Sequence, residues 1–150
     1  MYRNSTVHYL TKVLIDIMFY GGILCCIAVP FIMPWLTALL GYAPDTVIPH
    51  SIVLILSGLC ALYILWQLKA MFKSLLCGNP FTEKNISCLR RCSVASFLIA
   101  IIYLVKTGFW FTITAAFIVI IFALLGLFSL TLKDVFKQAV AYKEENDWTV

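Results

Sequence analysis

The chain has 150 residues, of which 63% are hydrophobic and only 12% are charged, and its formal net charge is +4. An average soluble domain is about 45–50% apolar and about 25% charged. A chain with half the usual charge cannot cover a water-facing surface. The composition therefore excludes an ordinary soluble domain and predicts a membrane protein whose outer surface is covered by lipid.

Four apolar runs are long enough to cross a membrane as helices, which takes about 20 residues each. The runs are continuous and do not alternate between apolar and polar residues, so strands are not expected. We predict an all-α bundle of four transmembrane helices that forms one domain over residues 1–150. The predicted spans are residues 13–33, 52–68, 86–105 and 109–130.

The first run is a membrane span rather than a signal peptide. It carries Asp16 within its apolar part and lacks a small-residue cleavage site at its end. Pro30 and Pro34 are expected to close this span, because proline removes a helical hydrogen bond and clashes with the preceding turn. Trp35 and Tyr42 follow in a loop, where aromatic side chains suit the headgroup layer.

Between the second and third spans lies a polar interruption, which we predict to be an elbow at residues 69–85. Within "GNPFTEKN", Pro80 cannot continue a helix and biases Asn79 toward an extended conformation. Thr82 is expected to cap the next helix, and Phe81 precedes this cap, where an apolar residue often packs onto the first turns. The interruption therefore predicts a turn between two helices.

After the fourth span, residues 131–150 form a tail. Val135, Phe136, Ala139 and Val140 recur at helical spacing, which predicts that the tail begins as an amphipathic helix. This apolar stripe is expected to be buried on headgroups, on the elbow or on a soluble partner. The last residues are expected to turn into water. Glu144, Glu145, Asp147 and Trp148 then form either an acidic docking strip or a frayed terminus without a partner.

The orientation follows from the cations. The chain has eleven Lys and Arg residues. If it crosses the membrane four times with its N-terminus inside, only Lys106 lies at the outer face and the other ten lie at the inner face. The positive-inside rule makes that face cytoplasmic, so both termini are predicted to be cytoplasmic. The positive charge then indicates contact with lipid headgroups. Direct nucleic-acid binding is not expected, because no basic cluster is interleaved with aromatic residues.

This topology predicts which residues can be labelled from outside the cell. We expect Cys77, in the elbow, to react with an impermeant thiol reagent only after permeabilisation, because it lies on the cytoplasmic face. Lys106 is expected to react with an impermeant amine reagent in intact cells. Reaction of Cys77 in intact cells would contradict the four-span topology.

Three charged residues are predicted to lie about one helical turn inside the membrane edge, namely Asp16, Arg90 and Arg91. An unpaired charge at such a depth is unfavourable, so a partner is expected. Lys12 could pair with Asp16 on the same helix face. The sharper hypothesis is a bridge from Asp16 to Arg90 or Arg91, which would tie the first span to the third.

The six cysteines are better explained by packing than by redox or metal chemistry. No C-x-x-C motif occurs, and thiols on the cytoplasmic side would be kept reduced. Small residues spaced by four let membrane helices approach closely. Such pairs and runs are Cys88, Cys92, Ser96 and Ala100 on the third span, Gly21 with Cys25 and Gly22 with Cys26 on the first, and Ser57 with Ala61 on the second.

Catalytic and cofactor sites are not expected. The two histidines, His8 and His50, fall on opposite sides of the predicted membrane, so they cannot form a paired metal site. Paired carboxylates for hydrolysis and a phosphate-binding glycine loop are missing from the sequence. We therefore expect neither an enzyme nor a bound metal or cofactor.

Two motifs carry a resemblance to a known family. "GNPFTEKN" at 78–85 with "LRR" at 89–91, and the tail "LKDVFKQAVAYKEENDWTV", resemble the elbow and closing motifs of the domain-of-unknown-function 2975 family. Trp148 stands where an aliphatic residue is more usual. The resemblance implies a small four-span protein of the bacterial cytoplasmic membrane. It also implies a partner, because members are often encoded beside a small helix-turn-helix regulator of the Cro type, but it implies no activity.

These observations favour a membrane-embedded interaction or regulatory platform that holds a small DNA-binding regulator at its cytoplasmic face. The alternative is a small oligomeric transporter, or an immunity-type protein that acts against a membrane-active peptide. The expected partners are the lipid bilayer, the regulator and a second copy of the chain. The candidate interaction residues are Asp16, Asn79, Pro80, Phe81, Arg90, Arg91, Glu144, Glu145, Asp147 and Trp148.

Overall fold

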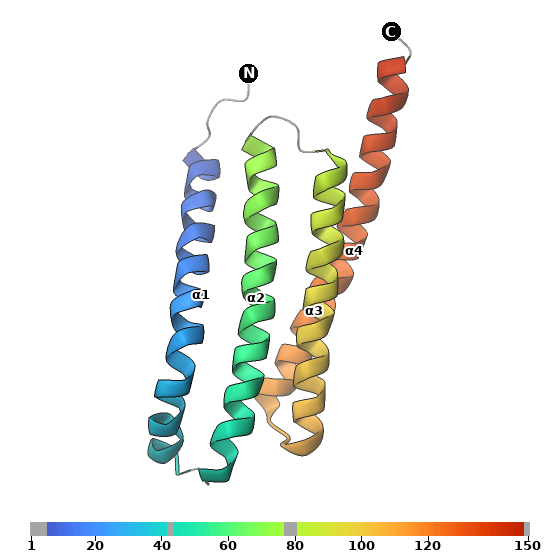
Figure 1. Cartoon of the computed structure of the whole chain (residues 1–150). Coiled ribbons are helices and arrows are strands. Elements are labelled where there is room, and N and C mark those ends of the chain that lie inside the picture. Colours follow the sequence, from blue (N-terminus) through green and yellow to red (C-terminus); the bar gives the residue numbers. More distant parts are fainter. Residues whose placement is uncertain (1–5, 42–43, 77–80, 149–150) are drawn as a thin grey trace.

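The computed structural model describes residues 6–41, 44–76 and 81–148, and in these residues it contains helices and no strand. The all-α prediction is thereby confirmed. In chain order the elements are α1 (Thr6–Leu39), the short 3₁₀ helix η1 (Pro44–Thr46), α2 (Val47–Leu76), α3 (Glu83–Phe109) and α4 (Ile113–Trp148) (Figure 1).

The four long helices run alternately in opposite directions, and α1, α2 and α3 stand side by side (Figure 1). Helix α4 crosses behind α3. Each long helix packs against its neighbour in the chain, so α1 meets α2, α2 meets α3 and α3 meets α4, whereas the backbones of α1 and α3 do not approach each other. The predicted bundle is therefore an open row in which α1 packs against one long helix only.

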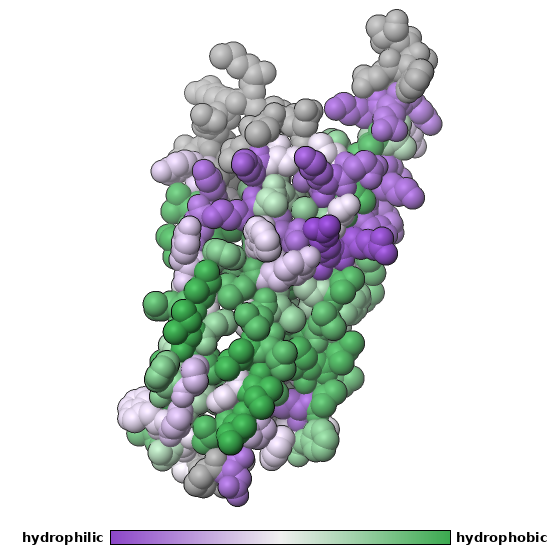
Figure 2. Space-filling view, in the orientation of Figure 1, coloured by the Kyte–Doolittle hydropathy of each residue, from purple (hydrophilic) through white to green (hydrophobic). Residues whose placement is uncertain are grey.

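All four long helices have the length and apolar composition needed to cross a membrane. Most of their large apolar side chains are exposed, including Phe31 on α1, Trp66 on α2 and Phe117 on α4. Figure 2 shows the apolar surface as a broad band, with polar residues gathered at the end where the chain begins and ends. Such a band is the surface that lipid tails would cover.

Helix α3 supplies most of the buried centre of the row. Ile99 is 1% exposed, and it belongs to a core cluster that also contains Ile64, Cys92, Ala95, Tyr103 and Ala115. Ser93 and Ser96 are 1% and 0% exposed. The small-residue ridge predicted on the third span is therefore confirmed as a packing surface at Cys92, Ser96 and Ala100, while Cys88 is half-buried.

The contact between α1 and α2 confirms only part of the small-residue prediction. A Cβ atom added to Gly58 would stand 2.6 Å from the Sγ atom of Cys26, and one added to Gly22 would stand 2.9 Å from Leu62 Cδ2. These residues let α1 and α2 approach closely. Gly21 has open space where its side chain would be, and Cys25 is exposed, so the expectation that this pair packs was wrong.

The prolines do not close the first span. Pro30 and Pro34 both lie inside α1, which continues to Leu39. In lipid there is no water to satisfy an exposed backbone, so helical continuation around a proline is favoured over an early end. Thr37 is buried in this continued part and donates its hydroxyl to the carbonyl oxygen of Met33 at 2.9 Å.

The turn between the third and fourth spans lies later than expected. The turn was predicted at residues 106–108, between spans at 86–105 and 109–130, but α3 continues to Phe109 and α4 begins at Ile113. The extra turn of α3 is held by a bond from the Trp110 N–H to the Lys106 carbonyl oxygen at 2.8 Å. Thr107 also donates its hydroxyl to the Tyr103 carbonyl oxygen at 2.8 Å. Gly108 therefore lies within the helix.

At the elbow, the predicted cap is confirmed. Thr82 has an extended backbone, and its side-chain oxygen accepts from the Asn85 N–H at 3.4 Å, which begins α3 at Glu83. Glu83 lies in the first turn, where its negative charge is favourable beside the positive end of the helix dipole. Asn79 and Pro80 lie outside the described residues.

Candidate functional site

The end of the row at which α1 and α3 begin and α2 and α4 end is called the charged end below. In the described part of the chain, every Lys and Arg except Lys106 lies within a few turns of this end, and Lys106 lies in the last turn of α3 at the opposite end. Figure 2 shows the polar residues as a band across the charged end. Of the sequence-predicted site residues, Asp16, Phe81, Arg90, Arg91, Glu144 and Glu145 lie toward this end.

Asp16 on α1 is paired with Lys69 on α2. The Lys69 Nζ atom lies 2.7 Å from the Asp16 Oδ1 atom, and this oxygen is shielded from solvent. The same ammonium lies 5.6 Å from the ring centre of Phe19 and 5.5 Å from that of Tyr20. A cation within about 6 Å of an aromatic ring is attracted to its face, so two rings of α1 add to the ion pair.

The predicted bridge from Asp16 to Arg90 or Arg91 was wrong. It would have required α1 to lie beside α3, but α2 stands between them. Lys69 reaches Asp16 instead, so the pair ties the first span to the second. The signal that sequence analysis missed is that Lys69 ends an apolar run at the same depth as Asp16, while Arg90 and Arg91 are separated from α1 by a whole helix.

The tail stripe is partly buried against the elbow. The ring centres of Phe81 and Phe136 lie 5.2 Å apart at an angle of 54°, within the range of favourable aromatic pairs. Val140, one turn later, is 8% exposed, whereas Val135 is exposed. Of the three surfaces considered for this stripe, the elbow therefore contacts Phe136 through Phe81.

Helix α4 is longer than a membrane crossing requires. It has 36 residues, of which about 20 suffice to cross the hydrocarbon. The remaining 16 residues rise about 24 Å at 1.5 Å each, and Figure 1 shows this part extending past the ends of α1, α2 and α3. Residues 133–148 are called the α4 extension below.

The outer end of the α4 extension is a fully exposed surface. Residues 141–146 are all exposed, and Tyr142 is 69% exposed. Glu144 and Glu145, two of the predicted interaction residues, belong to this surface. Asp147 and Trp148 form the last turn of the helix, and their side chains lie outside the described residues. The predicted docking strip is therefore helical at least as far as Trp148.

The described residues hold no group of three or more potential metal ligands. Cys25, Cys26, Cys60, Cys88 and Cys92 are free thiols, and His50 stands far from them at the opposite end, beside the Trp110 ring. What the charged end offers is a combination of charge, exposed aromatic surface and a protruding helix. A surface of this kind can bind another molecule.

Neither a curated protein nor a solved structure matches this chain. A family model does match it, over residues 15–150, and that family is described as a protein of unknown function, DUF2975. The match includes α2, α3 and α4 entirely and all of α1 except its first residues. With nearly the whole sequence covered, the chain belongs to the DUF2975 family.

Proposed function

We propose that this protein is a docking platform in the cytoplasmic membrane of a bacterial cell, with its charged end toward the cytoplasm. In this proposal four spans anchor the α4 extension, and the extension binds a cytoplasmic protein. The observation that carries the proposal is the length of α4, which continues as a helix for about 24 Å beyond the part needed to cross the hydrocarbon and is exposed at residues 141–146.

The base of the α4 extension is held against the rest of the protein. Phe81 contacts Phe136 at the start of the extension, and Val140 is buried within the protein. A segment that is already helical and fixed in direction loses less conformational entropy on binding than a disordered tail. The exposed turns beyond Val140 are therefore well suited to present a binding surface at a defined distance from the membrane.

The composition of the exposed surface suggests the class of partner. Tyr142 provides an exposed aromatic anchor, a residue type enriched among energetically important contacts. Glu144 and Glu145 add negative charge beside it. This combination is complementary to a basic protein surface, as found on a small DNA-binding regulator, where carboxylates compete with phosphate. We therefore propose such a regulator as the partner.

The test is co-purification after crosslinking in native membranes. Deleting residues 144–150, or reversing charge with Glu144→Lys and Glu145→Lys, is expected to leave the protein inserted but to release the partner from the membrane fraction. The expected loss is about tenfold or more in recovered partner, because like charges facing a basic surface oppose association. Tyr142→Ala is expected to weaken recovery as well.

A matched control reverses the same amount of charge elsewhere at the charged end. Glu83→Lys with Asp134→Lys changes two acidic residues away from the outer end of the α4 extension. Glu83 lies in the first turn of α3, and Asp134 lies at the start of the extension. Recovery of the partner should remain near the wild-type level in this variant. If the tail variants retain the same co-purifying proteins as the full chain, the docking proposal fails.

The transporter alternative receives less support from the arrangement of the helices. A space of about 320 Å³ has lining side chains from all four long helices, and these are mainly apolar and small, such as Val29, Leu62 and Phe122. Ion or solute pathways are usually lined by polar or ionisable groups near the middle of the membrane. The apolar lining gives no support to a conduction pathway.

A further inference from the structure

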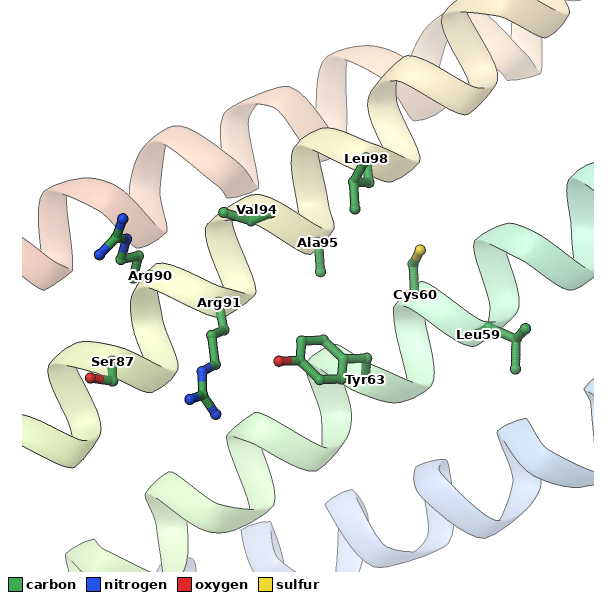
Figure 3. Close-up of a pocket in the computed structure, with 9 residues that line it drawn as sticks. All are labelled: Leu59, Cys60, Tyr63, Ser87, Arg90, Arg91, Val94, Ala95 and Leu98. Atoms are coloured by element: carbon green, nitrogen blue, oxygen red, sulfur yellow. The ribbon is translucent and has the colours of Figure 1, made fainter.

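A groove of about 610 Å³ opens between α2 and α3 near the charged end. Figure 3 shows Arg91 reaching from α3 into the space beside α2, and the hydroxyl of Tyr63, on α2, directed to the side on which Arg91 lies. Ser87 precedes Arg91 by one turn on the same ridge of α3. The part of the groove nearest the charged end therefore carries a cation and two hydroxyl groups.

The lining changes from polar to apolar toward the middle of the membrane. Two ridges of α3 border the groove, Ser87–Arg91–Ala95 and Arg90–Val94–Leu98, and both begin polar or cationic and end apolar. On α2 the same change runs from Tyr63 to Leu59. Val94 and Leu98 are 55% and 47% exposed, so the apolar part is open to the surroundings.

The two guanidinium groups stand at an unusual depth. If Lys106 marks the opposite membrane edge, a crossing of about 20 residues begins near Ile86, and Arg90 and Arg91 then lie about one turn inside the hydrocarbon. Among the residues that the structure describes, no ion pair joins Arg90 or Arg91 to a carboxylate. A charge at this depth is favoured by an anionic partner.

We propose that this groove binds one anionic phospholipid, with its phosphate at Arg91 and an acyl chain along Val94, Leu98 and Leu59. Arg90 borders the groove, and Figure 3 shows its side chain directed to the other side of α3, so it adds positive charge at the same level. A phospholipid is complementary to the groove, because its anionic headgroup matches the cationic end and its long apolar chain matches the apolar end. Arginine can meet phosphate oxygens with two parallel hydrogen bonds, and basic recesses between membrane helices are suited to anionic headgroups. The hydroxyls of Ser87 and Tyr63 can donate to the same phosphate.

This lipid site is independent of the docking function, because it is built on α2 and α3 rather than on the α4 extension. The site would bind a phospholipid whether or not a cytoplasmic partner is present. It also accounts for the two unpaired arginines, which the docking function leaves unused. A lipid held between α2 and α3 would fill the groove at the level where these helices carry charge inside the membrane edge.

The test is native mass spectrometry of the full chain in detergent, with added dioleoyl phosphatidylglycerol or dioleoyl phosphatidylcholine. The wild-type protein is expected to retain one phosphatidylglycerol in preference to phosphatidylcholine. Arg90→Gln with Arg91→Gln is expected to weaken phosphatidylglycerol binding about thirtyfold, as loss of two cations near a headgroup implies. Binding of phosphatidylcholine should change little.

A matched control removes two other cations of the charged end. Lys133→Gln with Lys137→Gln, on α4, takes away the same charge without touching the groove, and its phosphatidylglycerol affinity should stay within about threefold of wild type. Equal losses in both double variants would overturn the proposal in favour of general charge attraction. Arg90→Lys with Arg91→Lys keeps both charges and the fold, and it should lose about fivefold because lysine lacks the paired geometry.

Inorganic phosphate separates a lipid site from a simple anion site. Phosphate added in the millimolar range is expected to leave the bound phosphatidylglycerol in place, because it cannot occupy the apolar part of the groove. Displacement of the lipid by phosphate alone would overturn the assignment to a phospholipid. Retention of lipid by the wild type and its loss only in the arginine variants would support it.

Discussion

Replacing Ser96 with leucine is expected to be among the most destabilising single changes in this protein. Ser96 is 0% exposed, and its hydroxyl donates to the Cys92 carbonyl oxygen at 2.9 Å on the same helix. The site has no room for three additional carbon atoms. Overpacking a close-packed interior destabilises a protein by about 1–3 kcal/mol. The free energy of unfolding in mixed detergent micelles, followed by loss of helix signal, measures the effect.

Two comparisons isolate the role of volume in that experiment. Ser96→Ala removes the hydroxyl without adding bulk, and side-chain hydrogen bonds between membrane helices contribute on average only about 0.6 kcal/mol. The Ser96 bond lies within one helix, so this change should have a small effect. Thr131 makes the same kind of bond, to the Leu127 carbonyl oxygen at 3.1 Å, but it is exposed. Thr131→Leu should therefore be nearly neutral. An unfolding free energy for Ser96→Leu equal to that of Thr131→Leu would contradict the close packing of α3.

The number of spans could be predicted from the sequence because it depends on composition alone. A run of about 20 apolar residues crosses a membrane whatever lies beside it. The ends of the helices depend on more than local signals. Pro30 and Pro34 normally end a helix in water, yet α1 continues through both, because an unsatisfied backbone is unfavourable in lipid. Gly108, at the predicted outer turn, is likewise included in α3.

Which helices lie side by side could not be predicted. Depth in the membrane follows from position along a run, so Asp16, Lys69 and Arg91 were all correctly expected near the same end. Depth does not say whether the third span stands beside the first. The row order α1, α2, α3, α4 decides that Lys69 reaches Asp16 and that Arg91 does not.

The small residues also show that sequence does not determine which helix face packs against a neighbour. A spacing of four identifies a ridge on a helix, but α1 carries two adjacent ridges of this kind, Gly21 with Cys25 and Gly22 with Cys26. The sequence offers no reason to choose between them, because both are apolar and small. Packing against Gly58 and Leu62 selects the second ridge and leaves the first open. The contact of Phe81 with Phe136 also joins residues from distant segments that no local pattern connects.

Reversing the charge of Asp16 is expected to cause a severalfold loss of correctly inserted and folded protein. In Asp16→Arg, a second cation would face Lys69 at the place where an ion pair of 2.7 Å now stands. Both side chains are only about a third exposed, at 31% for Asp16 and 39% for Lys69. Like charges at this depth are poorly screened and must move apart. The amount of protease-resistant protein in membranes measures the loss.

Restoring the opposite charges on the same pair should recover folding. Asp16→Arg with Lys69→Asp keeps one cation and one anion in contact between α1 and α2, so the double variant is expected to approach the wild-type level. Asp16→Arg with Arg91→Asp should remain defective, because the α3 arginine does not reach α1. The Phe19 and Tyr20 rings of α1 that now attract the Lys69 ammonium would have no cation on α2 to attract, so recovery should be incomplete. Rescue by Arg91→Asp but not by Lys69→Asp would place α3 beside α1 and overturn the order of helices in the row.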